Sequence, residues 1–159
     1  MIVGSVLRET AALLVAWALA AGCGSGTPPQ PDREWLANAR GVIEQLRGDV
    51  LTVSGYDRLA AARRGLRDDS ELYQLLVVYT DFGGCLHMTA AVGAVPPGRE
   101  RVVRLLHRAC GHLLRADTLF TRAVAHGAPG SLVRATQQAV AAVPALDAAA
   151  LALAGTRHS

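Results

Sequence analysis

The chain contains no lysine, and all 16 of its basic residues are arginine. An arginine side chain stays protonated in proteins, so the absence of lysine excludes Schiff-base chemistry and a lysine general base. Aromatic residues are also scarce, at 4% of 159 residues. Because a surface for stacking nucleotide bases needs several aromatic rings, we expect no nucleic-acid partner.

Several motifs that carry chemistry are absent as well. No Glu-x-x-His pair occurs, which excludes the ligands of a ferritin-like di-iron centre, and no Cys-x-x-Cys-His sequence supports covalent haem. The sequence has neither a glycine-rich phosphate loop nor a Gly-x-Ser-x-Gly elbow. We therefore expect no catalytic residues, no cofactor and no enzymatic activity.

The N-terminus has the pattern of an export signal. Residues 10–22 are uncharged and precede Cys23 directly, and this run is shorter than the roughly 20 apolar residues of a membrane span. The segment Leu19–Cys23 resembles the lipobox of bacterial lipoproteins, in which a peptidase cuts before a cysteine that carries diacylglycerol. The resemblance implies a signal peptide over residues 1–22 and lipidation at Cys23. The alternatives are an ordinary secretory signal and an uncleaved anchor.

A domain organisation follows from the composition after Cys23. Glycine, serine and proline dominate residues 23–31, which predicts a flexible tether. Residues 32–154 form the folded domain, and residues 155–159 are expected to be a disordered tail. If Cys23 carries the lipid that the resemblance implies, we expect the domain at the extracytoplasmic face of the cell membrane.

Apolar residues recur at helical spacing in four windows of that domain. We expect helices over residues 32–54, 70–94, 99–126 and 131–154. A short helical piece is expected over 56–64, caps at Ser70 and Ser131, a proline turn at 95–98 and a kink at Pro144. No window alternates in the manner of a strand. The sequence predicts an all-α fold, an up-down four-helix bundle with one inter-helix disulfide.

Each predicted helix has one apolar face that we expect to be buried. The expected core residues are Leu36, Ala39, Ile43, Leu46, Val50 and Val53 in the first helix, Leu72, Leu75, Tyr79, Phe82, Leu86 and Thr89 in the second, and Val103, Leu106, Cys110, Leu113, Phe120 and Val124 in the third.

Two cysteines lie within the predicted domain. Cys85 comes twelve residues before Pro97 and Cys110 thirteen residues after it, so the two lie at nearly the same height in an antiparallel helix pair. Both fall on apolar faces, and an exported compartment permits oxidation. We therefore predict a disulfide between Cys85 and Cys110. The alternative is two separate buried thiols.

The same region offers a metal hypothesis. Met88 and His107 each lie three residues from one of the cysteines, on the same side of the helix. Cys85, Met88, His107 and Cys110 would together form a soft ligand set suited to copper. The two hypotheses compete, because a disulfide consumes both thiolates.

Five further residues are assigned structural roles. His87 and His112 point away from the cysteines and are expected at the surface. Gly83 and Gly84 allow close helix approach or a local bend. Asp117 lies within the apolar face of its helix, so we expect it to pair with an arginine or tyrosine of another helix rather than to act as a catalytic acid.

Arginines gather on one side of the predicted helix 99–126, opposite its apolar face. They are Arg101, Arg104, Arg108, Arg115 and Arg122. This arginine face could lie on anionic lipid or on another acidic partner. The alternative is a solvated outer face in a chain that has no lysine.

The segments YTDFGGC (Tyr79–Cys85) and HRACGHL (His107–Leu113), within alanine- and arginine-rich helices, look like the small, uncharacterised helical lipoproteins of high-GC Gram-positive bacteria. The resemblance implies a non-enzymatic binding or structural module of the cell envelope. Its expected partners are the membrane, through the lipid, and an envelope protein or anionic lipid. The alternative function is a small-ligand or copper carrier that uses the bundle core.

Overall fold

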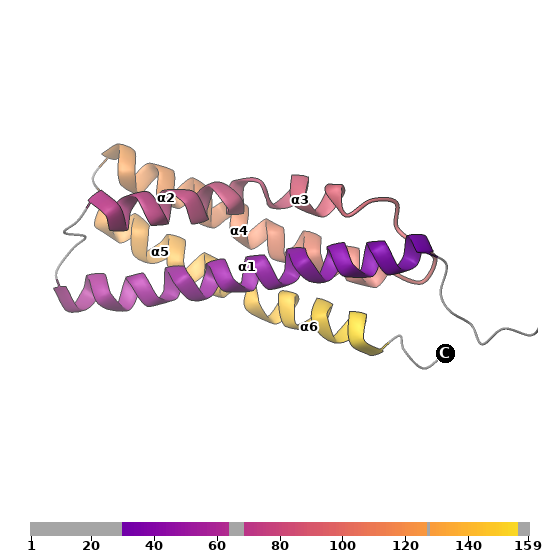
Figure 1. The fold of residues 1–159 in the computed structure, drawn as a ribbon. Helices are drawn as coiled ribbons and strands as arrows, with labels where there is room; N and C mark the ends of the chain where they lie inside the picture. Colours follow the sequence, from indigo (N-terminus) through magenta and orange to yellow (C-terminus); the bar gives the residue numbers. More distant parts are fainter. Residues whose placement is uncertain (1–29, 64–68, 127, 156–159) are drawn as a thin grey trace, which may run out of the picture.

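The computed structural model describes residues 30–63, 69–126 and 128–155, which form helices joined by short turns (Figure 1). The helices are α1 (Gln30–Arg63), α2 (Asp69–Gly83), α3 (Cys85–Ala91), α4 (Glu100–His126), α5 (Pro129–Val140) and α6 (Val143–Ala154). No strand occurs within these ranges. The all-α prediction is confirmed. The structure has six helices here instead of four because the predicted helices 70–94 and 131–154 are each divided in two.

The two longest helices, α1 and α4, organise the molecule. α4 packs against α2, α3, α5 and α6, and α1 contacts the same four helices from the other side. In Figure 1, α1 runs the length of an elongated molecule, alongside α2 followed by α3 and alongside α5 followed by α6. The hydrophobic core therefore lies between α1, α4 and these two rows of shorter helices.

The first helix is longer than the sequence predicts. An end at Ser54 and a separate piece over 56–64 are wrong, since α1 continues through Gly55 to Arg63. One glycine within a helix costs about 1 kcal/mol relative to alanine, less than the burial of a side chain such as Val53 contributes. The predicted tether also ends early, because α1 begins at Gln30. Pro31 fits there, as proline is tolerated in the first turn of a helix.

The second predicted helix is interrupted at Gly84, between α2 and α3. The Gly84 amide donates to the Thr80 carbonyl at 2.9 Å and the Met88 amide to the Gly84 carbonyl at 3.0 Å, so helical hydrogen bonds continue across the interruption. The local irregularity expected at Gly83 and Gly84 is therefore a break of one residue between two helices. Gly93 and Gly98 then adopt positive φ angles of 105° and 81° in the turn before α4, a conformation that glycine reaches without strain.

The last predicted helix breaks at residues 141–142, just before the expected kink at Pro144. Proline has no N–H to donate to the carbonyl four residues back, that of Val140, so the helix ends there and restarts as α6. The expected cap at Ser131 is wrong. α5 begins at Pro129, with Ala128 as its N-cap, and the buried Ser131 lies inside the helix.

Aromatic and aliphatic side chains fill the centre of the core. The ring of Tyr79 stacks on Phe120, with centroids 4.1 Å apart, and meets Phe82 edge-on at 5.3 Å. α5 and α6 contribute mostly alanine to this core, which lets α4 approach them closely. Their buried alanines are Ala135, Ala139, Ala145 and Ala149, and Ala142 in the break between the two helices is buried as well.

Three expected core residues are exposed, namely Leu72, Leu86 and Val124. Leu72 lies at the edge of the face formed by the rest of α2, Leu86 follows the interruption at Gly84, and Val124 lies in the last turn of α4, where packing partners end. In contrast, Trp35 is buried, although its neighbour Leu36 was expected to be the first core residue of α1 and is only partly buried.

Candidate functional site

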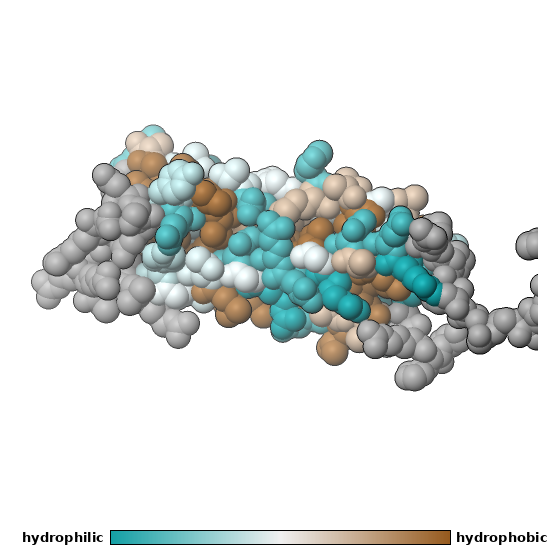
Figure 2. Space-filling view, in the orientation of Figure 1, coloured by the Kyte–Doolittle hydropathy of each residue, from teal (hydrophilic) through white to brown (hydrophobic). Residues whose placement is uncertain are grey.

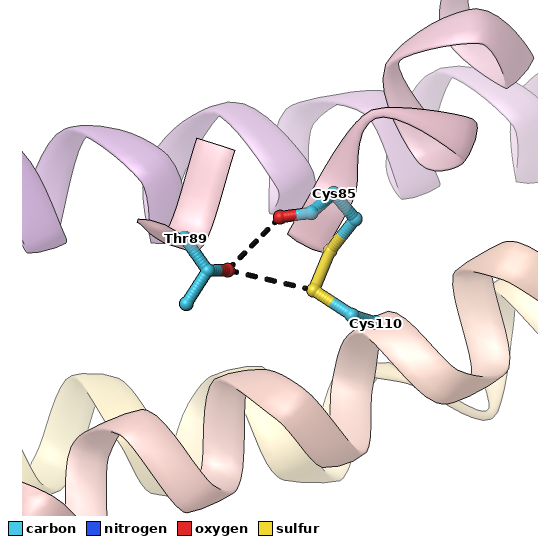
Figure 3. The surroundings of a disulfide bond; sticks show 3 residues. All are labelled: Cys85, Thr89 and Cys110. Atoms are coloured by element: carbon cyan, nitrogen blue, oxygen red, sulfur yellow. Dashed lines mark hydrogen bonds between the residues drawn. A yellow bond between two sulfur atoms is a disulfide. The ribbon is translucent and has the colours of Figure 1, made fainter. Parts of the chain in front are cut away.

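A disulfide joins α3 to α4. Cys85 is the first residue of α3 and Cys110 lies within α4; their Sγ atoms are 1.99 Å apart and their Cα atoms 5.5 Å apart (Figure 3). This is the pairing that the sequence predicts. Both residues are fully buried in the core. The bond closes a chain segment that contains α3 and the glycine turn before α4.

Thr89 completes the surroundings of this bond. It lies one turn after Cys85, and its Oγ1 donates to the Cys85 carbonyl at 3.0 Å and lies 3.5 Å from the Cys110 Sγ (Figure 3). The hydroxyl is buried but has a hydrogen-bond partner, so its burial costs little. The result is a disulfide packed among core groups and screened from solvent.

The proposed copper ligands are not all available while Cys85 and Cys110 form a disulfide. Met88 is partly buried against the core, and His107 is an exposed residue that lines a cavity together with Thr89. The sulfurs of Cys85 and Cys110 are bonded to each other, so they offer no thiolates. In the described ranges, no three His, Cys, Asp or Glu side chains come together as a group that could hold a metal ion. The copper hypothesis therefore applies to the reduced protein.

All five residues of the arginine face are exposed on α4, as the sequence predicts. The buried side of the same helix carries Val102, Leu106, Ala109, Cys110, Leu113, Ala116 and Phe120. Arg115 is bound to neighbouring side chains of the protein itself.

Arg115 forms a polar cluster between α4 and α5. Its Nε donates to Gln138 Oε1 at 3.2 Å, and its Nη2 lies 3.2 Å from His112 Nδ1. His112 Nδ1 also lies 3.3 Å from Gln138 Oε1. The expectation of a surface position is wrong for His112, which is partly buried at this helix contact, and correct for the exposed His87. Sequence reasoning missed this cluster because Gln138 lies on another helix.

Two neighbouring carboxylates were also not predicted from the sequence. Asp49 of α1 and Asp81 of α2 lie close enough to interact, and Gln45 Nε2 donates to Asp81 Oδ2 at 3.2 Å. Burial, and to a smaller extent the charge of Asp81, together raise the pKa of Asp49 from 3.8 to about 6. The Oδ2 atom of Asp49 is buried and has no hydrogen-bond partner among the described residues.

Asp117 is partly buried within the apolar face of α4. Its carboxylate faces Gly83 of α2, where a β-carbon would lie 3.1 Å from Oδ2. The expected pairing with an arginine or tyrosine of another helix stays a prediction. Burial raises the pKa of Asp117. The expected role of Gly83 in close helix approach is confirmed, because glycine leaves room for this carboxylate.

Apolar side chains also reach the surface. In Figure 2, hydrophilic side chains follow α1 across the middle of the molecule, with apolar side chains above and below them. Exposed apolar residues include Tyr73, Leu76 and Val77 on α2 and Leu151 on α6. One described stretch, Gly130–Ala154, is long and apolar enough to cross a membrane by length and composition alone, a test that core helices also pass.

The predicted signal peptide and Cys23 lie outside the described residues. The chain matches no protein-family model, no curated protein and no solved structure. The functional argument therefore rests on the residues of this chain.

Proposed function

We propose that the chain is a membrane-anchored extracytoplasmic lipoprotein whose helical domain is a non-enzymatic binding or structural module of the cell envelope. The Cys85–Cys110 disulfide is the observation that carries the proposal. Disulfides persist in oxidising compartments outside the cytoplasm and are rare within it. The signal-like residues 1–22 and the lipobox resemblance ending at Cys23 supply the route to such a compartment.

We also propose an up-down four-helix bundle as the architecture of this module. In it, α2 with α3 and α5 with α6 each count as one interrupted helix. The support is that both long helices, α1 and α4, contact members of both rows, and that the interruptions at Gly84 and at residues 141–142 have local causes.

The membrane, reached through the lipid on Cys23, is the first proposed partner. The arginine face is assigned to solvation of the outer side of α4, since a chain without lysine has only arginine for this purpose. An envelope protein or anionic lipid is the alternative partner for this face. Binding of the chain to anionic vesicles that collapses in high salt would contradict the assignment to solvation.

Substitution of Cys23 tests the anchoring. Cys23→Ser is expected to release the protein from the membrane fraction or to leave it unprocessed, whereas Ser25→Ala, two residues on, leaves processing and fractionation unchanged. The domain of the parent protein is expected to be open to added protease in intact spheroplasts. A Cys23→Ser variant that is cleaved and membrane-bound like the parent would contradict the proposal.

The carrier alternative depends on the state of the cysteines. Copper carriage by Cys85, Met88, His107 and Cys110 needs both thiolates, and therefore a reduced protein. Carriage of a small organic ligand needs only a cavity.

A further inference from the structure

A cavity of about 200 Å³ lies beside the disulfide, between the start of α1, the end of α3 with its following turn, and α4. Its walls include Trp35, Thr89, Val92, Val103, Leu106 and His107. Most of these side chains are apolar, and no carboxylate or guanidinium contributes to the wall. The cavity therefore suits an uncharged, largely apolar molecule.

The indole of Trp35 gives this cavity one polar feature. Trp35 is 3% exposed, and its Nε1 is buried and donates to no acceptor of the described residues. A buried donor without a partner costs about 1 to 3 kcal/mol, so an unpaired indole N–H on a residue that lines a cavity favours an acceptor supplied from outside the protein.

The other polar groups of the wall are less suited to this role. The Thr89 hydroxyl already donates to the Cys85 carbonyl, so its hydrogen is occupied. His107 is exposed at the cavity and can donate or accept only through its ring nitrogens. The wall thus has one unpaired buried donor among apolar groups, which matches a ligand with a single hydrogen-bond acceptor on an apolar body.

Size limits the ligand further. An apolar cavity of about 150 Å³ accommodates benzene, so this cavity has room for one ring with a short substituent. Several ordered water molecules that filled the cavity would each need two to four polar partners, more than Trp35, Thr89 and His107 supply together.

We propose that the cavity binds a small uncharged molecule, about one ring in size, whose carbonyl-type oxygen accepts the Trp35 indole N–H. The binding site lies wholly in the described helices and does not depend on Cys23. A failure of ligand binding in the cavity and a failure of membrane anchoring are therefore separate outcomes.

The test uses ¹⁵N-labelled full-length chain in detergent, with Trp17→Phe so that Trp35 gives the only indole N–H resonance. Acetophenone, a ring with one carbonyl, is expected to shift that resonance in a saturable way. Ethylbenzene, which has a similar shape and no acceptor, is expected to bind about three- to tenfold more weakly. Benzoate, which is charged, is expected to produce no saturable shift.

A matched pair of variants separates the cavity from partition into detergent. Ala90 lines the cavity and is exposed, so Ala90→Leu is expected to fill it without disturbing the core and to weaken acetophenone binding at least tenfold. Ala91→Leu, at an exposed neighbour outside the wall, leaves binding unchanged. Absence of a saturable shift, or an equal shift in Ala90→Leu, would overturn the site. Equal affinity for acetophenone and ethylbenzene would overturn the role of Trp35.

Discussion

Gly83 of α2 lies directly against Asp117 of α4: a β-carbon at Gly83 would come within 3.1 Å of the Asp117 Oδ2. That distance is shorter than an ordinary van der Waals contact between a β-carbon and an oxygen, and the Asp117 side chain is partly buried. The two helices therefore approach as closely as they do because residue 83 has no side chain.

We expect Gly83→Ala to lower the free energy of unfolding by about 0.5 to 1 kcal/mol, since the new methyl group displaces the Asp117 carboxylate. In an Asp117→Ala background the same substitution should be neutral or stabilising, because alanine favours the helix. Urea unfolding of the four proteins of this cycle measures the coupling.

Gly48→Ala is the matched control for that cycle. Gly48 is an exposed residue of α1 with nothing within 4 Å of its β-carbon position. Gly48→Ala should raise the free energy of unfolding by about 0.5 to 1 kcal/mol, because alanine favours the helix. Equal effects of Gly83→Ala with and without Asp117 would show that the close approach has no energetic consequence.

The disulfide should be complete in protein prepared from its own compartment. Ellman titration of unfolded, unreduced protein carrying Cys23→Ser is expected to find no free thiol. The chain-entropy estimate for a loop of this size predicts that Cys85→Ala with Cys110→Ala lowers the free energy of unfolding by about 3 kcal/mol. Two free thiols per chain would contradict the bridge and favour the copper hypothesis.

Asp49 should make stability depend on pH. Its pKa is raised to about 6 in the folded protein, so the native state binds more protons than the unfolded state between about pH 4 and 6. Stability from this group is therefore highest below that window and is lost as the pH rises through it. Asp49→Asn should raise the free energy of unfolding at pH 7 by about 1 kcal/mol, a value reduced for partial exposure, and by less at pH 4.

Chemical unfolding of parent and variant across pH 4 to 7 measures this dependence. Glu44→Gln, an exposed carboxylate on the same helix, is the control and should leave the shape of the pH profile unchanged. An Asp49→Asn effect of the same size at both ends of the range would rule out the predicted titration.

The arginines of α4 should differ in their effect on stability. Arg115→Gln removes the hydrogen bonds to Gln138 and His112 and should cost about 0.5 to 1 kcal/mol, because these contacts are partly exposed. Arg104→Gln, an exposed neighbour with no such contact, should change stability by less than about 0.5 kcal/mol. Thermal unfolding of the two variants compares them, and equal stability would show that the cluster is energetically neutral.

Sequence periodicity predicted α4 within one residue at its start, because the apolar and arginine faces of that helix are well separated. It also predicted the Cys85–Cys110 pair, since the position of the proline turn fixes the height of both residues. The break at residues 141–142 was less accurately predicted. Proline acts on the carbonyl four residues before it, so the helix ends ahead of Pro144 itself.

Contacts between helices were harder to predict than the helices themselves. Asp49 and Asp81 are far apart in the sequence, and each lies beside an apolar face, so their proximity depends on the rotation of α1 relative to α2. The choice between Trp35 and Leu36 as the buried residue depends on the same rotation. A helical period defines which residues share a face, but it does not fix how one face turns toward another.

The position of the disulfide has a consequence for local unfolding. α3 has only seven residues, too few for a helix to be stable in water by itself, and the bond attaches its first residue to α4. Reduction would leave α3 and the glycine turn as the part of the core that opens most readily to amide exchange, while α4 stays protected. Since Thr89 and Val92 of this segment form one wall of the cavity, the thiol redox state would set how long the cavity keeps its shape.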